Sequence, residues 1–109
     1  MSPAAVAQRP LESAAKILPE CRLFLATPED ASAEDELDQI RGVCAGKISA
    51  LLNVAPLLEP RYRFCKPEGV TVRQAIEVVV AQLEGQPELW RLSFDALALG
   101  AFVKAWRCP

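Results

Sequence analysis

The four cysteines are the residues of this chain with the clearest chemistry. They stand at positions 21, 44, 65 and 108, far apart and without any CxxC pair. Zinc sites usually draw their cysteines from pairs only a few residues apart, so no metal site is expected. An even number of widely spaced cysteines in a short chain predicts two disulfides and an oxidising compartment. The alternative is four buried free thiols, because cysteine is among the most buried residue types.

Histidine is absent from the sequence, which limits the catalytic chemistry. A Cys-His or Ser-His nucleophile pair and a histidine-containing metal site are therefore excluded. An enzyme would have to use a carboxylate pair such as Glu77 and Glu88, or a cysteine with no base near its thiolate. We expect no catalytic residue, no metal and no cofactor.

Composition indicates one globular domain. The chain has 109 residues, of which 51% are hydrophobic and 24% charged, with a formal net charge of −2. No apolar run approaches the ~20 residues that cross a bilayer, and the small negative charge removes the electrostatic case for binding nucleic acid. Neither nucleic acid binding nor membrane insertion is expected. Residues 1–10 carry two prolines and predict a flexible arm, and residues 11–109 a single helical domain.

The first ten residues lack the basic and apolar segments of a secretory signal, although disulfides imply export. Ala5, Val6 and Ala7 have the small-x-small form of a cleavage site. We therefore expect a periplasmic or extracellular protein whose signal peptide is missing from this sequence.

The best-defined helix spans residues 72–84. Thr71 followed by Gln74 predicts a capping box, and the apolar residues after it recur every three or four positions. They are Val72, Ala75, Ile76, Val79, Val80 and Leu83. Gly85 is expected to end this helix in the left-handed conformation, and Pro87 to begin the next.

A last helix is expected from about Pro87 to Trp106, with a seam against the preceding helix. The seam residues are Leu89, Leu92, Ala96, Leu99, Val103 and Trp106. Trp90, Phe94, Leu97 and Phe102 would occupy other faces. A helix that is apolar on more than one side is either central or covered by a second subunit, so Trp90 and Phe94 are candidates for a dimer or partner face.

Two further helices precede these. The first covers residues 11–26 and contains Pro19, which predicts a kink or restart at Leu18. The second begins after Ser32 and reaches about residue 53. Within it Gly42 and Gly46 lie one turn apart and leave a flat strip. Core packing is the commoner use of such a strip, and a dimer or partner face is the alternative.

Helix lengths favour one pairing of the cysteines. Helix 72–84 rises ~20 Å and helix 87–106 ~30 Å, and the tight turn between them implies an antiparallel pair that brings Cys108 to Cys65. A hairpin of the first two helices likewise brings Cys21 toward Cys44. Each bridge would contribute ~3 to 4 kcal/mol. The sequence thus predicts an all-α, compact four- to five-helix disulfide-stapled bundle.

The connection over residues 54–70 is long for a helical bundle and rich in proline. Connections of this length without secondary structure are usually functional or disordered. We interpret it as a contact surface, with a passive crossover around a short buried turn as the alternative. The candidate contact residues are Leu57, Leu58, Glu59, Arg61, Tyr62 and Arg63.

A family pattern runs from Phe64 to the C-terminus. It consists of FCxPEGVTxxQ over residues 64–74, VVV at 78–80, Leu83, Pro87-Glu88, and AFxxAWRC over residues 101–108. Upstream, Cys44-x-Gly46 matches part of a Cys-x-Gly-Tyr-x-x-Gly element, with Lys47 in place of the aromatic residue. With these motifs the chain resembles the immunity proteins of bacterial type VI secretion systems, the resistance-associated and amidase immunity (Rap/Tai) group.

This resemblance implies an exported, periplasmic, disulfide-bonded helical protein, often a homodimer, that binds a secreted effector enzyme and blocks its active site. In the amidase branch the effector is a papain-like Cys-His peptidoglycan endopeptidase. In that role Glu59 would approach a catalytic histidine or amide donors, Tyr62 would fill a substrate pocket and Arg61 would anchor on acidic groups. The alternatives are a small helical carrier of an apolar ligand and an oligomerisation module without inhibitory role.

Overall fold

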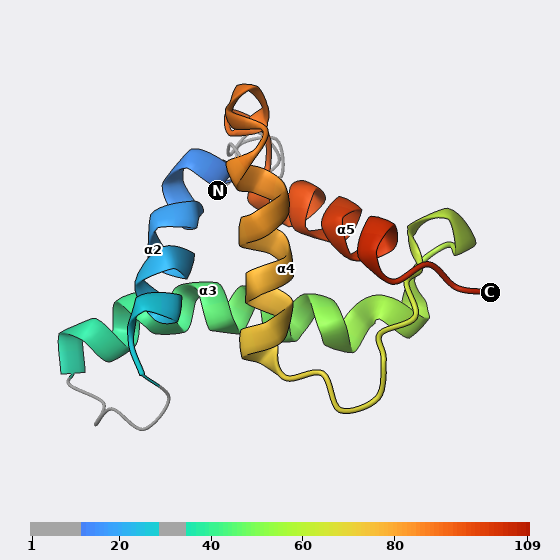
Figure 1. Ribbon diagram of the computed structural model, residues 1–109, viewed down its shortest axis with the longest axis horizontal. Helices are drawn as coiled ribbons and strands as arrows, with labels where there is room; N and C mark the ends of the chain where they lie inside the picture. The colour runs from blue at the N-terminus through green and yellow to red at the C-terminus, as the bar shows by residue number, and fades with distance from the viewer. Residues whose placement is uncertain (1–11, 29–34) are drawn as a thin grey trace, which may run out of the picture.

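The computed structural model describes residues 12–28 and 35–109 (Figure 1). The described α-helices are α2 (Ala14–Ala26), α3 (Asp35–Val54), α4 (Val72–Glu84) and α5 (Phe94–Ala105). The short 3-10 helices are η1 (Ala55–Leu57), η2 (Pro60–Tyr62) and η3 (Pro87–Leu89). The prediction of an all-α, disulfide-stapled bundle is confirmed. The predicted arm over residues 1–10 and the cap at Ser32 lie outside the described residues. The first described helix begins at Ala14 with Ser13 as its N-cap, so the start predicted at residue 11 is wrong.

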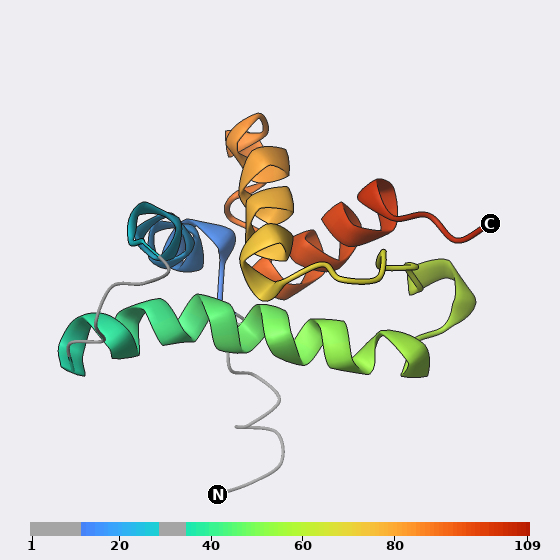
Figure 2. The same ribbon diagram turned by 60° about the horizontal axis from the view of Figure 1, so that its bottom comes forward.

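Helix α4 stands at the centre and begins as the sequence predicts. The Thr71 hydroxyl accepts a hydrogen bond from the Gln74 N–H at 3.1 Å, and the Gln74 side chain accepts from the Thr71 N–H at 2.9 Å. Figures 1 and 2 show α2 and α5 on opposite sides of α4, with α3 crossing beneath them. The buried face of α4 comprises Ala75, Ile76, Val79, Val80 and Leu83. This face forms one core with residues of α2, α3 and α5.

The last predicted helix is interrupted, so the expectation of one helix over residues 87–106 is wrong. The chain forms η3, turns through residues 90–93 and starts α5 at Phe94. In this turn the carbonyls of Trp90 and Leu92 accept hydrogen bonds from the N–H groups of Ala15 at 2.8 Å and Ala14 at 2.9 Å. The first N–H groups of a helix have no partner within it. The break therefore supplies the N-terminus of α2 with acceptors that a continuous helix would have used internally.

The C-terminus of α4 also departs from the prediction. Gly85 has a φ of −82°, so it does not adopt the left-handed conformation. The carbonyl of Leu83, one of the last in the helix, accepts from the backbone N–H of Gln86 at 3.0 Å and from the indole N–H of Trp90 at 2.7 Å. Among the described residues the left-handed conformation occurs at Gly69, with a φ of +86°, in the turn that leads to Thr71.

Helix α5 turns a different face to the core than the predicted seam. Its buried residues are Phe94, Ala98, Ala101 and Phe102, whereas Ala96 is exposed and Leu99 and Val103 are half-buried. The helix is apolar almost all round, so spacing alone did not distinguish its sides. The two phenylalanines bury more apolar surface than Leu99 and Val103 would, and they take the core.

Both disulfides have the predicted pairing, but the helices around them are arranged differently from the prediction. Cys21–Cys44 joins α2 to α3, and Cys65–Cys108 joins the segment after η2 to the C-terminal residues. The helices concerned are not antiparallel hairpins, because α3 crosses α2 and α5 crosses α4 at steep angles in both views (Figures 1 and 2). Helix α2 also continues through Pro19 without the restart considered for Leu18.

The C-terminus of α2 is held by the central helix. The guanidinium of Arg73, in the first turn of α4, donates to the carbonyls of Leu25 at 2.8 Å and Thr27 at 3.1 Å. It also lies over the ring of Phe24, 5.5 Å from the ring centroid. The last carbonyls of a helix need partners outside it, and here a neighbouring helix supplies them.

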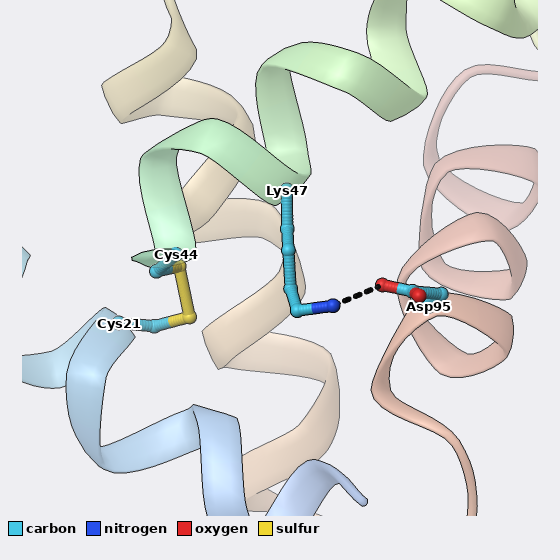
Figure 3. The surroundings of a disulfide bond; sticks show 4 residues. All are labelled: Cys21, Cys44, Lys47 and Asp95. Atoms are coloured by element: carbon cyan, nitrogen blue, oxygen red, sulfur yellow. Dashed lines mark ion pairs between the residues drawn. A yellow bond between two sulfur atoms is a disulfide. The ribbon is translucent and has the colours of Figure 1, made fainter. Parts of the chain in front are cut away.

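Lys47 connects three segments beside the Cys21–Cys44 bridge (Figure 3). Its ammonium lies 3.1 Å from Oε1 of Glu12 and 3.5 Å from Oδ1 of Asp95. Burial acts to lower the pKa of Lys47, but its hydrogen bond to Glu12 and the charges of Asp95 and Glu12 outweigh burial and raise it. The same hydrogen bond and the charge of Lys47 lower the pKa of Glu12. Lys47, which replaces the aromatic residue of the Cys-x-Gly-Tyr element, thus links α3 to α5 and to the segment just before α2.

The cap of α5 can be tested by substitution. The Ser93 hydroxyl accepts from the Ala96 N–H at 3.3 Å, so Ser93→Ala should lower the free energy of unfolding by ~1 kcal/mol. Urea denaturation of the oxidised protein, followed by circular dichroism, measures the change. Ser93→Asp keeps a capping oxygen and should retain most of the stability. Equal loss in both variants would show that the cap does not stabilise the helix start.

The ion pairs of Lys47 predict a pH dependence of stability. The lowered pKa of Glu12 means that its contribution is present above the ordinary value of 4.5 and is lost as the pH falls through the folded-state pKa. The raised pKa of Lys47 means that its contribution is present below 10.5 and is lost as the pH rises through the folded-state pKa. Lys47→Met should therefore destabilise the protein most near neutral pH, and the difference from wild type should shrink in acid.

Urea unfolding across the pH range measures this difference. Lys66→Met is the control, because Lys66 is exposed and its ammonium meets the Val70 carbonyl at 3.4 Å rather than a carboxylate. A Lys47→Met effect that stays constant from neutral to acid pH would contradict the role of the ion pairs.

Candidate functional site

An open groove of about 570 Å³ lies between η2 and α5. Its lining residues are Arg61, Tyr62, Ala96, Leu99, Gly100, Val103, Lys104 and Arg107. Leu99 and Val103 are half-buried apolar residues, and the cations Arg61, Lys104 and Arg107 are exposed. The lining contains no carboxylate and no thiol, so the groove combines an apolar floor with a positively charged rim.

The Cys65–Cys108 disulfide holds the two walls of the groove together. It joins the chain directly after η2 to the residues after α5, and the Cys65 N–H donates to the carbonyl of Trp106 at 2.7 Å. Beneath it the Phe102 ring stacks on Trp106 with 5.1 Å between centroids, and Phe64 lies 5.1 Å from Phe102. Figures 1 and 2 show the chain around η2 beside the C-terminal half of α5. The groove is therefore built on a covalent bond and a buried aromatic cluster.

The predicted contact loop forms two 3-10 turns and is mostly exposed. Leu57 has 83% of its surface exposed, whereas Leu58 is half-buried and packs against the core. The Arg63 guanidinium donates to the Leu58 carbonyl at 2.6 Å, which closes the loop on itself. Prolines at the start of both turns fix φ there. The loop is thus an ordered projection, in agreement with a contact surface, and Leu58 belongs to its base.

Charged and aromatic side chains meet at η2. Arg61 lies 3.4 Å from the carboxylate of Glu59, and its guanidinium stands 4.6 Å from the centroid of the Tyr62 ring. Arg61 and Tyr62 also line the groove. Of the six predicted contact residues, these two are the ones that the structure combines with α5, while Leu57, Glu59 and Arg63 stay on the exposed loop.

Sequence reasoning missed the contribution of α5. The three- and four-residue spacing places Leu99 and Val103 in a seam against α4 and gives Lys104 and Arg107 no role. The signal in the sequence is the second apolar side of this helix, which predicts a central position or a covered face. In the structure one apolar side enters the core and the other forms the floor of the groove.

The four residues proposed as a dimer or partner face do not share one surface. Phe94 is 0% exposed and lies in the core, because α5 begins there and turns its first residue inward. Trp90 is half-buried, with its indole bonded to Leu83 and the guanidinium of Arg22 5.2 Å from its ring centroid. Gly42 and Gly46 are exposed on α3, and a Cβ at either would meet no atom within 4 Å. Phe94 is therefore removed from the candidate face.

The described residues contain no candidate metal centre and no candidate membrane span. Residues 12–28 and 35–109 contain no cluster of three or more cysteine, histidine or carboxylate side chains placed to hold a metal ion. None of the described helices is both long enough and apolar enough to cross a bilayer. The groove combines apolar surface with exposed cations, an arrangement suited to binding.

Comparison with known proteins places the chain in a family. The family model described as Rap1a immunity proteins matches residues 13–108. No curated protein and no solved structure matches the chain. The matched range includes both disulfides and all but the outermost parts of the described chain, and it agrees with the motif pattern from Phe64 onward. The chain therefore belongs to the Rap1a immunity proteins, a family of immunity proteins of type VI secretion.

Proposed function

We propose that the protein acts in the periplasm, where it binds a type VI effector and occludes its active site. Membership of the Rap1a family supports the immunity role. Two disulfides support an oxidising compartment, because such bonds persist mainly outside the cytoplasm. The proposed effector is a peptidoglycan amidase or endopeptidase, which rests on the resemblance of the C-terminal half to the amidase immunity proteins.

The observation that carries this proposal is the exposed, ordered loop over residues 57–63. An inhibitor that enters an enzyme cleft loses less conformational entropy when its loop is already ordered. Here the two proline-initiated turns, the Arg63–Leu58 hydrogen bond and the nearby Cys65–Cys108 bridge order the loop before binding. Occlusion needs no catalytic group in the inhibitor, which agrees with the absence of histidine from the sequence.

The loop carries side chains of the kinds that dominate binding energy. Tyrosine and arginine are enriched among residues whose truncation costs most at interfaces, and Tyr62 and Arg61 lie together at the groove. Leu57 is the most exposed large apolar side chain among the described residues and would be available to enter the cleft. Glu59, paired with Arg61, would offer its carboxylate to donors in the active site of the effector.

The alternative of a carrier for an apolar ligand has less support. A carrier encloses its ligand in an internal cavity. The hollows described here are open at the surface along α5, and the core between the helices is filled by buried side chains. A homodimer stays a prediction, with the exposed strip at Gly42 and Gly46 as its candidate surface; light scattering of the purified protein tests it.

Protection of living cells tests the immunity role. A strain that lacks the gene should be killed by parental cells that deliver type VI effectors, and a copy fused to a secretory signal should restore survival. The same copy without a signal should give no protection, because the effector acts on the cell wall. Equal survival of the deletion strain and its parent would contradict the proposal.

Loop variants test which surface occludes the effector. The effector can be captured on the wild-type protein from cells that survive attack. Leu57→Asp with Tyr62→Ala should weaken binding of this effector by about 30-fold or more, which is the effect of losing interface contacts worth ~2 kcal/mol. Leu92→Asp is the control, since Leu92 is another exposed leucine, 38% exposed, outside the loop. Unchanged inhibition of peptidoglycan cleavage by the loop variant would exclude the loop as the blocking element.

The bridge that holds the loop gives a further prediction. Joint Cys65→Ser and Cys108→Ser substitution opens a loop of 43 residues and should lower the free energy of unfolding by ~4 kcal/mol. Affinity for the effector should also fall at a temperature where circular dichroism shows a folded protein, because the loop then pays its ordering entropy on binding. Full affinity in the folded variant would show that the bridge serves stability alone.

A further inference from the structure

The outward side of α5 carries two hollows that flank one line of residues. The larger is the groove toward η2, and the smaller, of about 180 Å³, lies toward α4. Both are lined by Ala96, Gly100 and Lys104, which follow one another at intervals of one turn. The outward side of α5 is therefore a low ridge between two depressions, extending from Ala96 to Lys104 over ~12 Å of helix.

The centre of this ridge is open. A Cβ built on Gly100 would meet no atom within 4 Å, and Ala96 is exposed. Side chains of a partner helix would fit into depressions on either side of a low ridge, which is how ridges pack into grooves between two helices. The half-buried Leu99 and Val103 in one hollow and Leu97 in the other would become fully buried by such contact.

The chemistry of the lining favours a helix over an extended segment. An extended peptide would place its backbone N–H and C=O groups against the apolar floor, where unpaired groups are costly. A helix satisfies those groups internally and presents only side chains. The polar lining groups of the larger groove stand at its rim, where they can meet side chains of a helix rather than its backbone.

The cations at the rim of the larger groove favour a partner with negative charge. Arg61, Lys104 and Arg107 border the larger groove, and its lining has no acid. Within the described part of the chain, neither Lys104 nor Arg107 has an ion-pair partner. Lys104 also lies in the last turn of α5, where the helix dipole favours a cation, but Arg107 lies beyond the helix and gains little from it. Carboxylates on a partner helix would complement this rim.

We propose that the outward side of α5 is an anchoring surface for an acidic amphipathic α-helix of the effector, a helix outside the catalytic cleft that the loop over residues 57–63 occludes. This inference rests on the proposed immunity function. The two contacts lie side by side on the protein, since Arg61 and Tyr62 belong to both the loop and the groove wall. One bound effector would thus be held at its active site and at a neighbouring acidic helix.

A large side chain added at the centre of the ridge tests the site without weakening the fold. Gly100→Leu places a large side chain over both hollows, and leucine is a better helix former than glycine, so the variant should be at least as stable as wild type. Cells that carry the exported Gly100→Leu variant should survive attack by parental cells no better than the deletion strain. Ala15→Leu adds the same side chain at an exposed position of α2, outside both hollows, and should protect like wild type.

Charge reversal tests the acidity of the partner. Lys104→Glu with Arg107→Glu should slow association with the captured effector about tenfold at low salt, and the effect should diminish as salt screens the charges. Arg91→Glu with Lys66→Glu reverses two exposed cations that do not line the groove, and its association rate should stay near that of wild type. Equal slowing by both pairs would contradict a local acidic contact.

Photocrosslinking identifies what lies in the groove. A photoreactive phenylalanine analogue at Leu99, introduced into the exported protein during a challenge, should give a covalent product with the effector. Peptide mapping should place the link in an acidic helical segment away from the catalytic residues. A link to a second copy of this chain, to a non-acidic segment, or no link at all would overturn the inference.

The outcomes separate the inference from the proposal beneath it. Survival of the deletion strain under attack would contradict both the immunity function and the binding role of the α5 surface. Death of the deletion strain, together with full protection by Gly100→Leu, would leave the immunity function intact and exclude the α5 surface.

Discussion

The two ends of α2 must find hydrogen-bond partners outside the helix, and the arrangement of the other helices follows from how they do so. At the N-terminus the carbonyls of Trp90 and Leu92 accept from the first N–H groups, and at the C-terminus Arg73 donates to the last carbonyls. These bonds tie α2 to the turn before α5 and to the start of α4. Because unpaired backbone groups are costly when buried, this requirement outweighs the helical tendency of residues 90–93.

Covalent and ionic links then fix the outer elements around this frame. Cys21–Cys44 joins α2 to α3, and Lys47 on α3 reaches the first turn of α5 through Asp95 (Figure 3). Cys65–Cys108 closes the opposite end, where η2 meets the last turn of α5. A chain of 109 residues has a small core, so staples of this kind contribute a large share of its stability.

The proposed binding surface arises where α5 has more apolar surface than the core can cover. Phe94 and Phe102 fill the interior, which leaves Leu99 and Val103 half-buried at the base of an open groove with Arg61, Lys104 and Arg107 around it. Exposed apolar surface rimmed by charge is typical of an interaction site on a small protein. The ordered loop beside it extends this surface, so a blocking element and an anchoring element form one continuous region.

The sequence alone determined the bounds of α4 and the presence of two disulfides, and it indicated the proline-rich loop as a candidate contact. These depend on local rules: Thr71 and Gln74 cap a helix through neighbouring backbone groups, and widely spaced cysteines in a small chain pair with one another. The predicted cysteine pairing is found, but the antiparallel hairpins from which it was derived are not. Only the tertiary structure decided that the last helix breaks before Phe94, because the acceptors of that break bond to α2, far away in sequence. It also decided which side of α5 is buried and hence where the groove lies. That helix is apolar nearly all round, and competition among Phe94, Phe102, Leu99 and Val103 for the core is settled by packing, which spacing does not encode.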